Sequence, residues 1–295
     1  MSDSLKEVFH AHVKHLQDKI TQQMQLIDPE LRVTEDAWER TDHAGAPGGG
    51  GRTRAFQGKI FENAGVNTSC VFGKIDPAFA SKLQGEGDTM WAAGISLIIH
   101  PYNPRVPTVH ANFRMIQQGP KIWFGGGADL TPFYPNEEDF RYFHGVWQRA
   151  AGTNYDWMKK ECDDYFVNHH RGGEMRGIGG LFFDGYNTGD LETDFQMVKG
   201  LSEHFIESYF PIVQKRVQEA FTAEDEEFQL HRRGRYVEFN LLHDRGTLFG
   251  LRTNGRVDSI LISLPARCKF TYQYAPAPNS PHEKMLSYYR PKAWV

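Results

Sequence analysis

Apolar residues recur every three or four positions over the first 24 residues of the chain. They are Leu5, Val8, Phe9, Val13, Leu16, Ile20 and Met24, and Pro29 follows them. This spacing gathers the apolar side chains on one side of a helix, and proline ends such a pattern. The pattern therefore predicts an N-terminal amphipathic helix within residues 1–30.

Alternating apolar and polar residues predict strands further along the chain. Two longer runs, Trp91–His100 and Thr108–Gln117, are joined by PYNPRVP, whose three prolines favour a rigid, irregular connection. The shorter runs RTRAFQ and NTSCVFG predict two earlier antiparallel strands. The glycine-rich segments Gly48–Gly51, GGGADLTPFYP and IGGLFFDGYNTGD predict turns and loops.

Helices are predicted for residues 137–151 and 155–170, and a helical pair for residues 191–221, with Pro211 at the start of the second member. In the last third, strands are predicted at Arg235–His243, Thr247–Thr253 and Arg256–Ser263. The Asp-Arg-Gly and Asn-Gly turns between them favour hairpins. Together the elements predict an α+β fold with a single domain, in which a large antiparallel β-sheet is flanked by helices on both faces. Residues 236–271 are a predicted dimerisation region, because a hairpin edge can pair with a second copy.

Composition excludes several classes of protein. The chain has 295 residues, of which 40% are hydrophobic and 24% charged, as is typical of a globular protein. Its net charge of −4 is too mild to indicate a nucleic-acid or membrane-surface partner. The three cysteines form no CxxC pair, which argues against a disulfide framework or a zinc ribbon. Without an apolar run of membrane-spanning length or a targeting segment, we expect a cytoplasmic protein with a small-molecule partner.

The strand around residue 110 carries the main candidate chemistry. Side chains two residues apart on a strand share a face, so His110, Asn112 and Arg114 project together, while the apolar residues between them project into the core. Ser96 and His100 share a face of the preceding strand, so pairing of the two strands would build a polar pocket floor. A guanidinium binds carboxylates through two hydrogen bonds, and Arg245 and Arg256 offer further cations at turns.

Other polar residues are weaker candidates. Asp244 and Asp129 begin turns, where aspartate usually caps the backbone, and Glu238 and Asn240 share a predicted strand face with Asp244. Four histidines, His100, His110, His144 and His170, could surround a divalent metal, although no HExxH or facial-triad spacing supports such a site. The alternatives left open are a half-exposed sheet with a solvated polar face, a metal-dependent oxygenase or hydrolase, and a non-catalytic carrier of an anionic ligand.

Five segments, in order, resemble those of the aerobic coproporphyrinogen III oxidases. They are HPYNPRVPTVHANFR, WFGGGADLTPFYP, RGIGGLFFD, FQLHRRGRYVEFNLLHDRGTLFGL and NGR, and the resemblance extends from Trp38 to Val295. It implies a homodimer that converts two propionates of coproporphyrinogen III to vinyl groups, giving protoporphyrinogen IX. Molecular oxygen would be the co-substrate, and no organic cofactor would be needed.

The resemblance also implies roles for individual residues. His110 would be the proton donor. As a hypothesis of our own, Asp244 and Arg245 are further catalytic residues: Asp244 engages the pyrrole nitrogens, and Arg245 anchors propionates together with Arg114 and Arg256. The implied substrate-binding residues are Ser96, Asn112, Phe113, Arg114, Asn254, Gly255 and Arg256. His100, His110, His144 and His170 match positions described as divalent-metal ligands in bacterial members.

Overall fold

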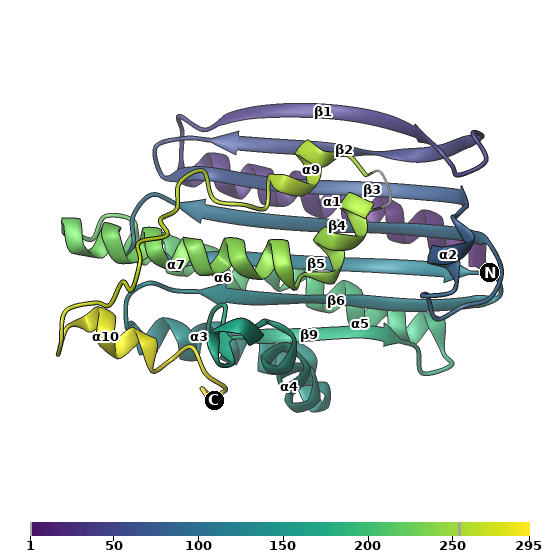
Figure 1. Cartoon of the computed structure of the whole chain (residues 1–295). Coiled ribbons are helices and arrows are strands. Elements are labelled where there is room, and N and C mark those ends of the chain that lie inside the picture. Colours follow the sequence, from purple (N-terminus) through teal and green to yellow (C-terminus); the bar gives the residue numbers. More distant parts are fainter. Residues whose placement is uncertain (1, 253–254) are drawn as a thin grey trace.

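The computed structural model of the protein describes residues 2–252 and 255–295. Its centre is an antiparallel seven-stranded sheet with the strand order β1-β2-β3-β4-β5-β6-β9 (Figure 1). The strands are β1 (Arg32–Thr41), β2 (Pro47–Gln57), β3 (Phe61–Lys74), β4 (Thr89–Pro101), β5 (Thr108–Gln118), β6 (Lys121–Thr131) and β9 (Gly180–Tyr186). A separate two-stranded ribbon pairs β7 (Val167–Asn168) with β8 (Glu174–Met175).

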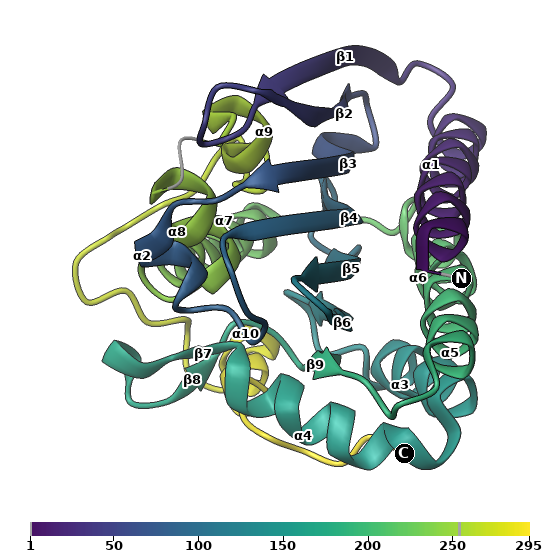
Figure 2. The ribbon, with the colours of Figure 1, turned by 90° about the vertical axis from the view of Figure 1, so that its right-hand side faces the viewer.

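Helices cover both faces of the large sheet, as Figure 2 shows. One face carries α1 (Ser2–Ile27), α3 (Glu137–Ala151), α5 (Leu191–Glu203) and α6 (Phe205–Arg216). The other carries α7 (Ala223–Leu242), α8 (Arg245–Arg252), α9 (Val257–Leu261) and α10 (Pro281–Leu286). Next to β9 lies α4 (Tyr155–Tyr165), and the short α2 (Pro77–Ala80) precedes β4. This arrangement confirms the predicted α+β fold.

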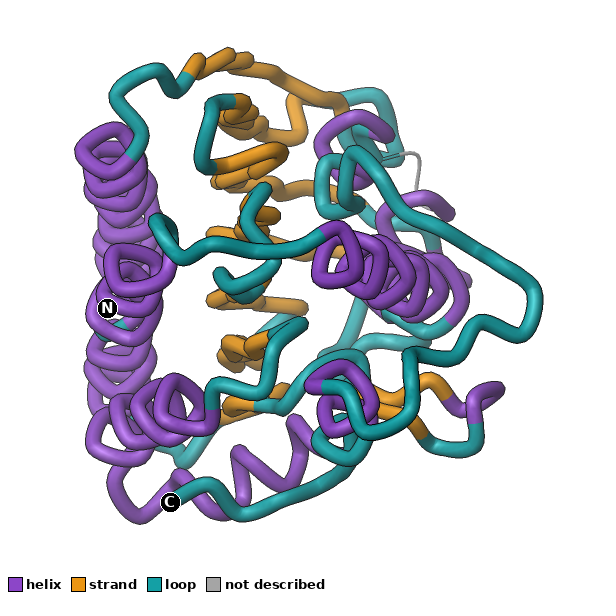
Figure 3. The backbone as a smooth tube through the Cα atoms, turned by 90° about the vertical axis from the view of Figure 1, so that its left-hand side faces the viewer, coloured by secondary structure: helices purple, strands orange, loops and turns teal. Residues whose placement is uncertain are grey.

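The main core lies between the sheet and the layer that contains α1 (Figure 3). The apolar stripe of α1 is buried there, and Phe9 contacts Phe124 of β6 with ring centroids 6.0 Å apart. The apolar side chains of β5 face the same layer, and Phe113 is 1% exposed. Burying each such side chain stabilises the fold by about 1.5–3 kcal/mol.

None of the helices in the described part of the chain has the length and the apolar character that a membrane-spanning helix needs.

Several predicted loops are strands in the structure. Gly48–Gly51 lies in β2, GGGADLT ends β6, and LFFDGY belongs to β9. Glycine weakens an isolated strand but permits close backbone approach within a sheet. At Gly50, for example, a Cβ atom would lie 2.1 Å from the carbonyl oxygen of Trp38 on the paired strand. The glycines here thus serve close strand packing, and the turn prediction was wrong.

Pro211 lies inside α6 and not at the start of a helix, where it was predicted. Its missing N–H leaves the carbonyl of Glu207 without the usual helical donor. The Tyr142 hydroxyl of α3 donates to that carbonyl at 3.0 Å. A tertiary contact therefore makes the internal proline tolerable.

The predicted C-terminal strands are wrong, because the segments form α7, α8 and α9. Thr222 begins α7 with a capping box, in which its hydroxyl accepts from the N–H of Asp225 and the Asp225 carboxylate accepts from the N–H of Thr222. The Asp-Arg-Gly turn starts α8, and Gly255 lies between α8 and α9, while Asn254 lies outside the described residues. The helix predicted to reach residue 170 ends earlier, with α4 at Tyr165.

Candidate functional site

The polar face of β5 carries the predicted side chains, and β5 pairs with β4 as predicted. β4 and β5 pair so that Ser96 lies opposite Asn112, and His110, Asn112 and Arg114 are all partly exposed. Glycines flank Arg114 on both sides, Gly94 on β4 and Gly125 on β6. Because glycine has no side chain, the Arg114 side chain can lie over Gly125, where a Cβ atom would come within 2.9 Å of its Nε.

His110 is held by a buried pair of charges. Its Nδ1 atom lies 2.9 Å from Oδ1 of Asp129, which sits directly opposite on β6. Arg176 donates to both oxygens of the same carboxylate, from Nη2 at 2.7 Å and from Nε at 3.2 Å. The Arg176 and Asp129 side chains are only 2% and 1% exposed, whereas that of His110 is 17% exposed.

This environment keeps Asp129 ionised. Burial alone would raise the pKa of the Asp129 carboxyl, but the Arg176 guanidinium and the hydrogen bond from His110 bring the pKa below its usual value. An ionised carboxylate only accepts hydrogen bonds, so the proton of the neutral His110 ring belongs on Nδ1. The other nitrogen, Nε2, has no hydrogen-bond partner within residues 2–252 and 255–295 and is left to take up or donate a proton.

The RGIGG segment brings Arg176 to this position. A Cβ atom at Gly177 would lie 2.1 Å from the carbonyl oxygen of Leu130, and one at Gly180 would lie 2.0 Å from that of Ala128. These glycines therefore let the loop backbone lie directly against β6. The guanidinium is further held by Asn240 of α7, whose Oδ1 accepts from Nη1 at 2.7 Å, and by the ring of Phe166, 4.3 Å from its centre.

The structure places Arg245 on the same face as Arg114, through a shared carboxylate. Arg114 Nη2 donates to Asp184 of β9 at 2.9 Å, and Arg245 Nη2 lies 3.8 Å from the other oxygen of Asp184. Arg114 also donates to Asn112 Oδ1 at 3.2 Å. Two guanidinium groups thus lie close together beside the partly exposed His-Asn-Arg row.

Asp244 begins α8 as a cap and is bound to a tyrosine. Its Oδ2 accepts from the N–H of Thr247 at 2.7 Å, and its Oδ1 accepts from the Tyr165 hydroxyl at 2.9 Å. Burial, and then the nearby Asp244 carboxylate, raise the pKa of Tyr165 to about 12, so its hydroxyl stays a donor at neutral pH. The Arg245 guanidinium also lies over the Tyr165 ring, 4.7 Å from the ring centre. Tyr165 consequently orients both predicted catalytic residues of this turn.

Other predicted substrate-binding residues lie elsewhere. The Phe113 side chain is in the core, on the opposite face of the sheet. Arg256 pairs with Asp36 of β1, four strands away from His110, which corresponds to about 19 Å at the usual strand spacing. Gly255 donates its N–H to the carbonyl of Gly250 at 2.8 Å, within the α8–α9 connection.

The four histidines predicted as metal ligands do not share a site. His100 is fully buried: its Nε2 donates to the Ser263 carbonyl at 3.1 Å, and its Nδ1 accepts from Thr108 Oγ1 at 3.2 Å. His144 uses its nitrogens in the same way, with the Ile178 carbonyl at 3.1 Å and the Tyr155 hydroxyl at 2.7 Å. Burial and nearby cations lower the pKa of each of these two rings to about 3, so both are neutral.

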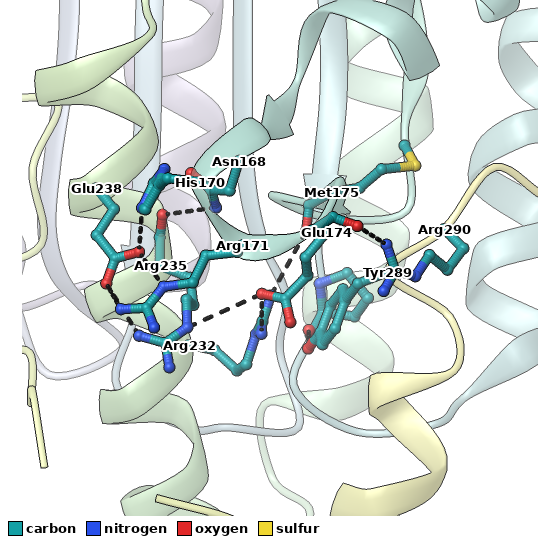
Figure 4. A network of polar contacts seen from close by, with 12 residues as sticks. Asn168, His170, Arg171, Glu174, Met175, Arg232, Arg235, Glu238, Tyr289 and Arg290 are labelled. Carbon is teal, nitrogen blue, oxygen red and sulfur yellow. Dashed lines mark hydrogen bonds and ion pairs between the residues drawn. The ribbon is translucent and has the colours of Figure 1, made fainter. Parts of the chain in front are cut away.

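His170 belongs to a different polar network, shown in Figure 4. Its Nε2 lies 2.9 Å from Glu238 and its Nδ1 lies 2.8 Å from His243 Nε2, while Arg171 also donates to Glu238. Across the described ranges, no three His, Cys, Asp or Glu side chains are grouped so that they could hold a metal ion. Since three of the four rings already use both nitrogens within the protein, the residues do not fit a four-histidine metal site.

Three residues of the candidate site escaped prediction from sequence: Asp129 as a partner of His110, Arg176, and Asp184. A signal for Asp129 was present, because Gly119-Pro120 forms a two-residue turn between Gln118 and Lys121. Counting back along the two strands from this turn pairs residue 110 with residue 129. Arg176 and Asp184 carry no such local signal, since a loop and a non-adjacent strand bring them in.

Glu238 and Asn240 had been assigned to one strand face. On the helix α7, residues two apart do not face the same way. Asn240 contacts Arg176, whereas Glu238 contacts Arg171 and His170. Only Asn240 is therefore connected to the His110 site.

A comparison with protein families identifies the family of the chain. The model of a family described as coproporphyrinogen III oxidase matches residues 8–294 of the 295-residue chain. The match includes every strand of the sheet and every side chain of the candidate site described above. The chain therefore belongs to the coproporphyrinogen III oxidase family.

Proposed function

We propose that the protein oxidatively decarboxylates two propionate groups of coproporphyrinogen III to vinyl groups, giving protoporphyrinogen IX with molecular oxygen as oxidant. The observation that carries the proposal is the Arg176–Asp129–His110 arrangement next to two carboxylate-binding arginines, Arg114 and Arg245. The family match supports the substrate and the place of the reaction in haem biosynthesis.

The balance of the reaction requires proton transfer. Each propionate side chain gives up carbon dioxide, one proton and two electrons as its two methylene carbons become a vinyl group. Oxygen takes the two electrons and two protons to become hydrogen peroxide, so one additional proton is consumed for each propionate. His110 is the group we assign to supply and remove protons, because its Nε2 is available and its Nδ1 is fixed by an ionised carboxylate.

Binding and orientation are the other tasks of this face. The substrate carries four propionates, and Arg114 and Arg245 bind carboxylates of the substrate in the proposed complex. Asp244, held by Tyr165, is the residue we assign to the pyrrole N–H groups. A porphyrinogen is electron-rich and can itself reduce oxygen once a pyrrole N–H is polarised, so positioning is the main catalytic contribution that we assign to the protein.

The oxidant can be tested with purified protein treated with a chelator and supplied with coproporphyrinogen III. In air, mass spectrometry should detect loss of two carbon dioxide molecules and four hydrogen atoms per substrate. Without oxygen, the substrate should remain unchanged. Conversion that proceeds equally without oxygen would show that the proposed oxidant is wrong.

Two further outcomes separate the remaining alternatives. A carrier would bind the substrate without releasing carbon dioxide. A metal-dependent enzyme would lose activity on chelation and regain it when one divalent metal is restored. The exposed histidine His15 on α1 provides a control, because a His15→Ala variant should retain full conversion.

A further inference from the structure

Asp184 occupies the place between the two candidate propionate-binding arginines. Its Oδ1 accepts from Arg114 Nη2 at 2.9 Å, and its Oδ2 lies 3.8 Å from Arg245 Nη2. The carboxylate thereby presents one oxygen to each guanidinium, as the carboxylate of a propionate would. No step of the proposed reaction uses Asp184.

A β-bulge positions the Asp184 carboxylate. Gly126 pairs with Phe183 and Phe124 pairs with Tyr186, so Asp184 and Gly185 together oppose the single residue Gly125. A Cβ atom at Gly125 would lie 2.9 Å from Arg114 Nε and 2.9 Å from Asp184 Oδ1. The ion pair therefore lies directly over a glycine that leaves space for it.

The contact is of a kind that a ligand can replace. The Arg114, Asp184 and Arg245 side chains are 33%, 30% and 63% exposed, and the distance to Arg245 is longer than a hydrogen bond. Ion pairs exposed to this degree contribute little to stability. Arg114 keeps a second acceptor, Asn112, when Asp184 is withdrawn, and Arg245 keeps its contact with the Tyr165 ring.

We propose that Asp184 is an internal substitute for a substrate propionate, which the substrate carboxylate displaces on binding. This inference rests on the proposed function. Before the substrate binds, Asp184 holds Arg114 and Arg245 close together and offsets one of their two positive charges. On binding, a propionate takes over the guanidinium contacts and Asp184 turns to water, so Asp184 competes with the substrate and sets its KM.

The test compares the steady-state kinetics of the wild type with Asp184→Asn, which keeps the shape and removes the charge. We expect KM for coproporphyrinogen III to fall by about two- to fivefold, the ratio that corresponds to one exposed ion pair. The wild-type KM should also depend more weakly on salt than the KM of the variant, because the variant face carries one more net positive charge. An Asp184→Ser variant provides a second measurement if the asparagine variant folds poorly.

Asp18 offers a matched control, since it also bridges two arginines, Arg52 at 2.7 Å and Arg54 at 2.8 Å, but from α1. Asp18→Asn should leave KM unchanged. Binding of the fluorescent, oxidised coproporphyrin III, which has the same four propionates, gives a readout independent of turnover and should tighten in the Asp184 variants.

An unchanged or raised KM in Asp184→Asn, with the wild type active, would overturn the displacement proposal alone and indicate that Asp184 only orients Arg114. Absence of decarboxylation by the wild type would instead overturn the proposed function. The two failures are therefore distinguishable in one set of assays.

Discussion

At the scale of single residues, His110 and Arg176 donate to one buried carboxylate, that of Asp129. Replacing Asp129 by asparagine keeps an acceptor for His110 but leaves the buried Arg176 charge without a counter-ion. Removing one partner of such a pair costs about 3–5 kcal/mol. We predict a loss of this size in the free energy of unfolding of Asp129→Asn, measured by urea denaturation at neutral pH.

A double variant separates the stability effect from the catalytic one. Adding Arg176→Met removes the uncompensated charge, so Asp129→Asn/Arg176→Met should recover much of the lost stability. Its activity should stay low, because the ring of His110 no longer faces an ionised carboxylate. Recovery of both stability and activity would show that Asp129 and Arg176 serve the fold alone.

His144 makes stability depend on pH. Burial lowers the pKa of the ring to about 3 in the folded protein, while in the unfolded chain the ring has its ordinary pKa of 6.5. Below pH 6.5 the unfolded chain takes up the proton first, so stability falls as the pH falls from about 6.5 towards 3. Protonation of this one ring in the unfolded chain should lower the free energy of unfolding by roughly 2 kcal/mol at pH 5.

The measurement is the change in unfolding free energy between pH 7 and pH 5. In His144→Gln that change should be smaller than in the wild type by about 2 kcal/mol, because the variant has no ring at this position to take up a proton. The exposed His15 gives the matched control, since His15→Gln should leave the change as it is. Equal pH dependence in His144→Gln and the wild type would contradict the assigned neutral state.

At the scale of elements, strand periodicity predicted β4 and β5 well because alternation and burial agree there. Val109, Ala111, Phe113 and Met115 are all fully buried on one face. The glycine-rich part of β6 could not be predicted in the same way, since its strand conformation comes from neighbours on both sides. The His110–Asp129 pair depends on that strand, so alternation alone did not reveal the pair, although counting back from the Gly119-Pro120 turn does.

In the segment Arg235–His243 at the end of α7, a strand was predicted where the structure has a helix. RYVEFNLLH alternates like a strand, yet it continues a helix that starts at Thr222 with a capping box. Loss of a cap typically costs about 1 kcal/mol. Thr222→Ala should therefore lower the free energy of unfolding by about this amount.

The same variant should leave turnover near the wild-type value, because Thr222 lies at the start of α7 and the site residue Asn240 near its end. Denaturation and steady-state assays on the same preparation test both expectations. An increase in stability on removing the hydroxyl would contradict the assigned capping role.

At the scale of the whole molecule, the proposed homodimer has a candidate surface in residues 236–271. Leu242 and Val257 are 56% and 52% exposed there, and they belong to helices where hairpin strands had been expected. Leu241, the sequence neighbour of Leu242, is also exposed, and adjoining exposed apolar side chains are typical of interaction surfaces. We predict that the protein sediments as a dimer and that Leu242→Asp shifts it towards the monomer.

Leu26 is the control for this experiment, because it is 73% exposed on α1. Leu26→Asp should sediment like the wild type. A dimer that is unaffected by Leu242→Asp but lost in Leu26→Asp would place the interface on the other side of the sheet.

The central claim is that His110, fixed by Asp129 and Arg176, transfers protons in the decarboxylation. The most direct test is the kcat of His110→Ala with coproporphyrinogen III in air, compared with His15→Ala. Loss of a general acid or base typically lowers a rate by about 10²–10⁴-fold, and we predict a fall in this range for His110→Ala alone. Turnover of a folded His110→Ala variant at the wild-type rate would contradict the account.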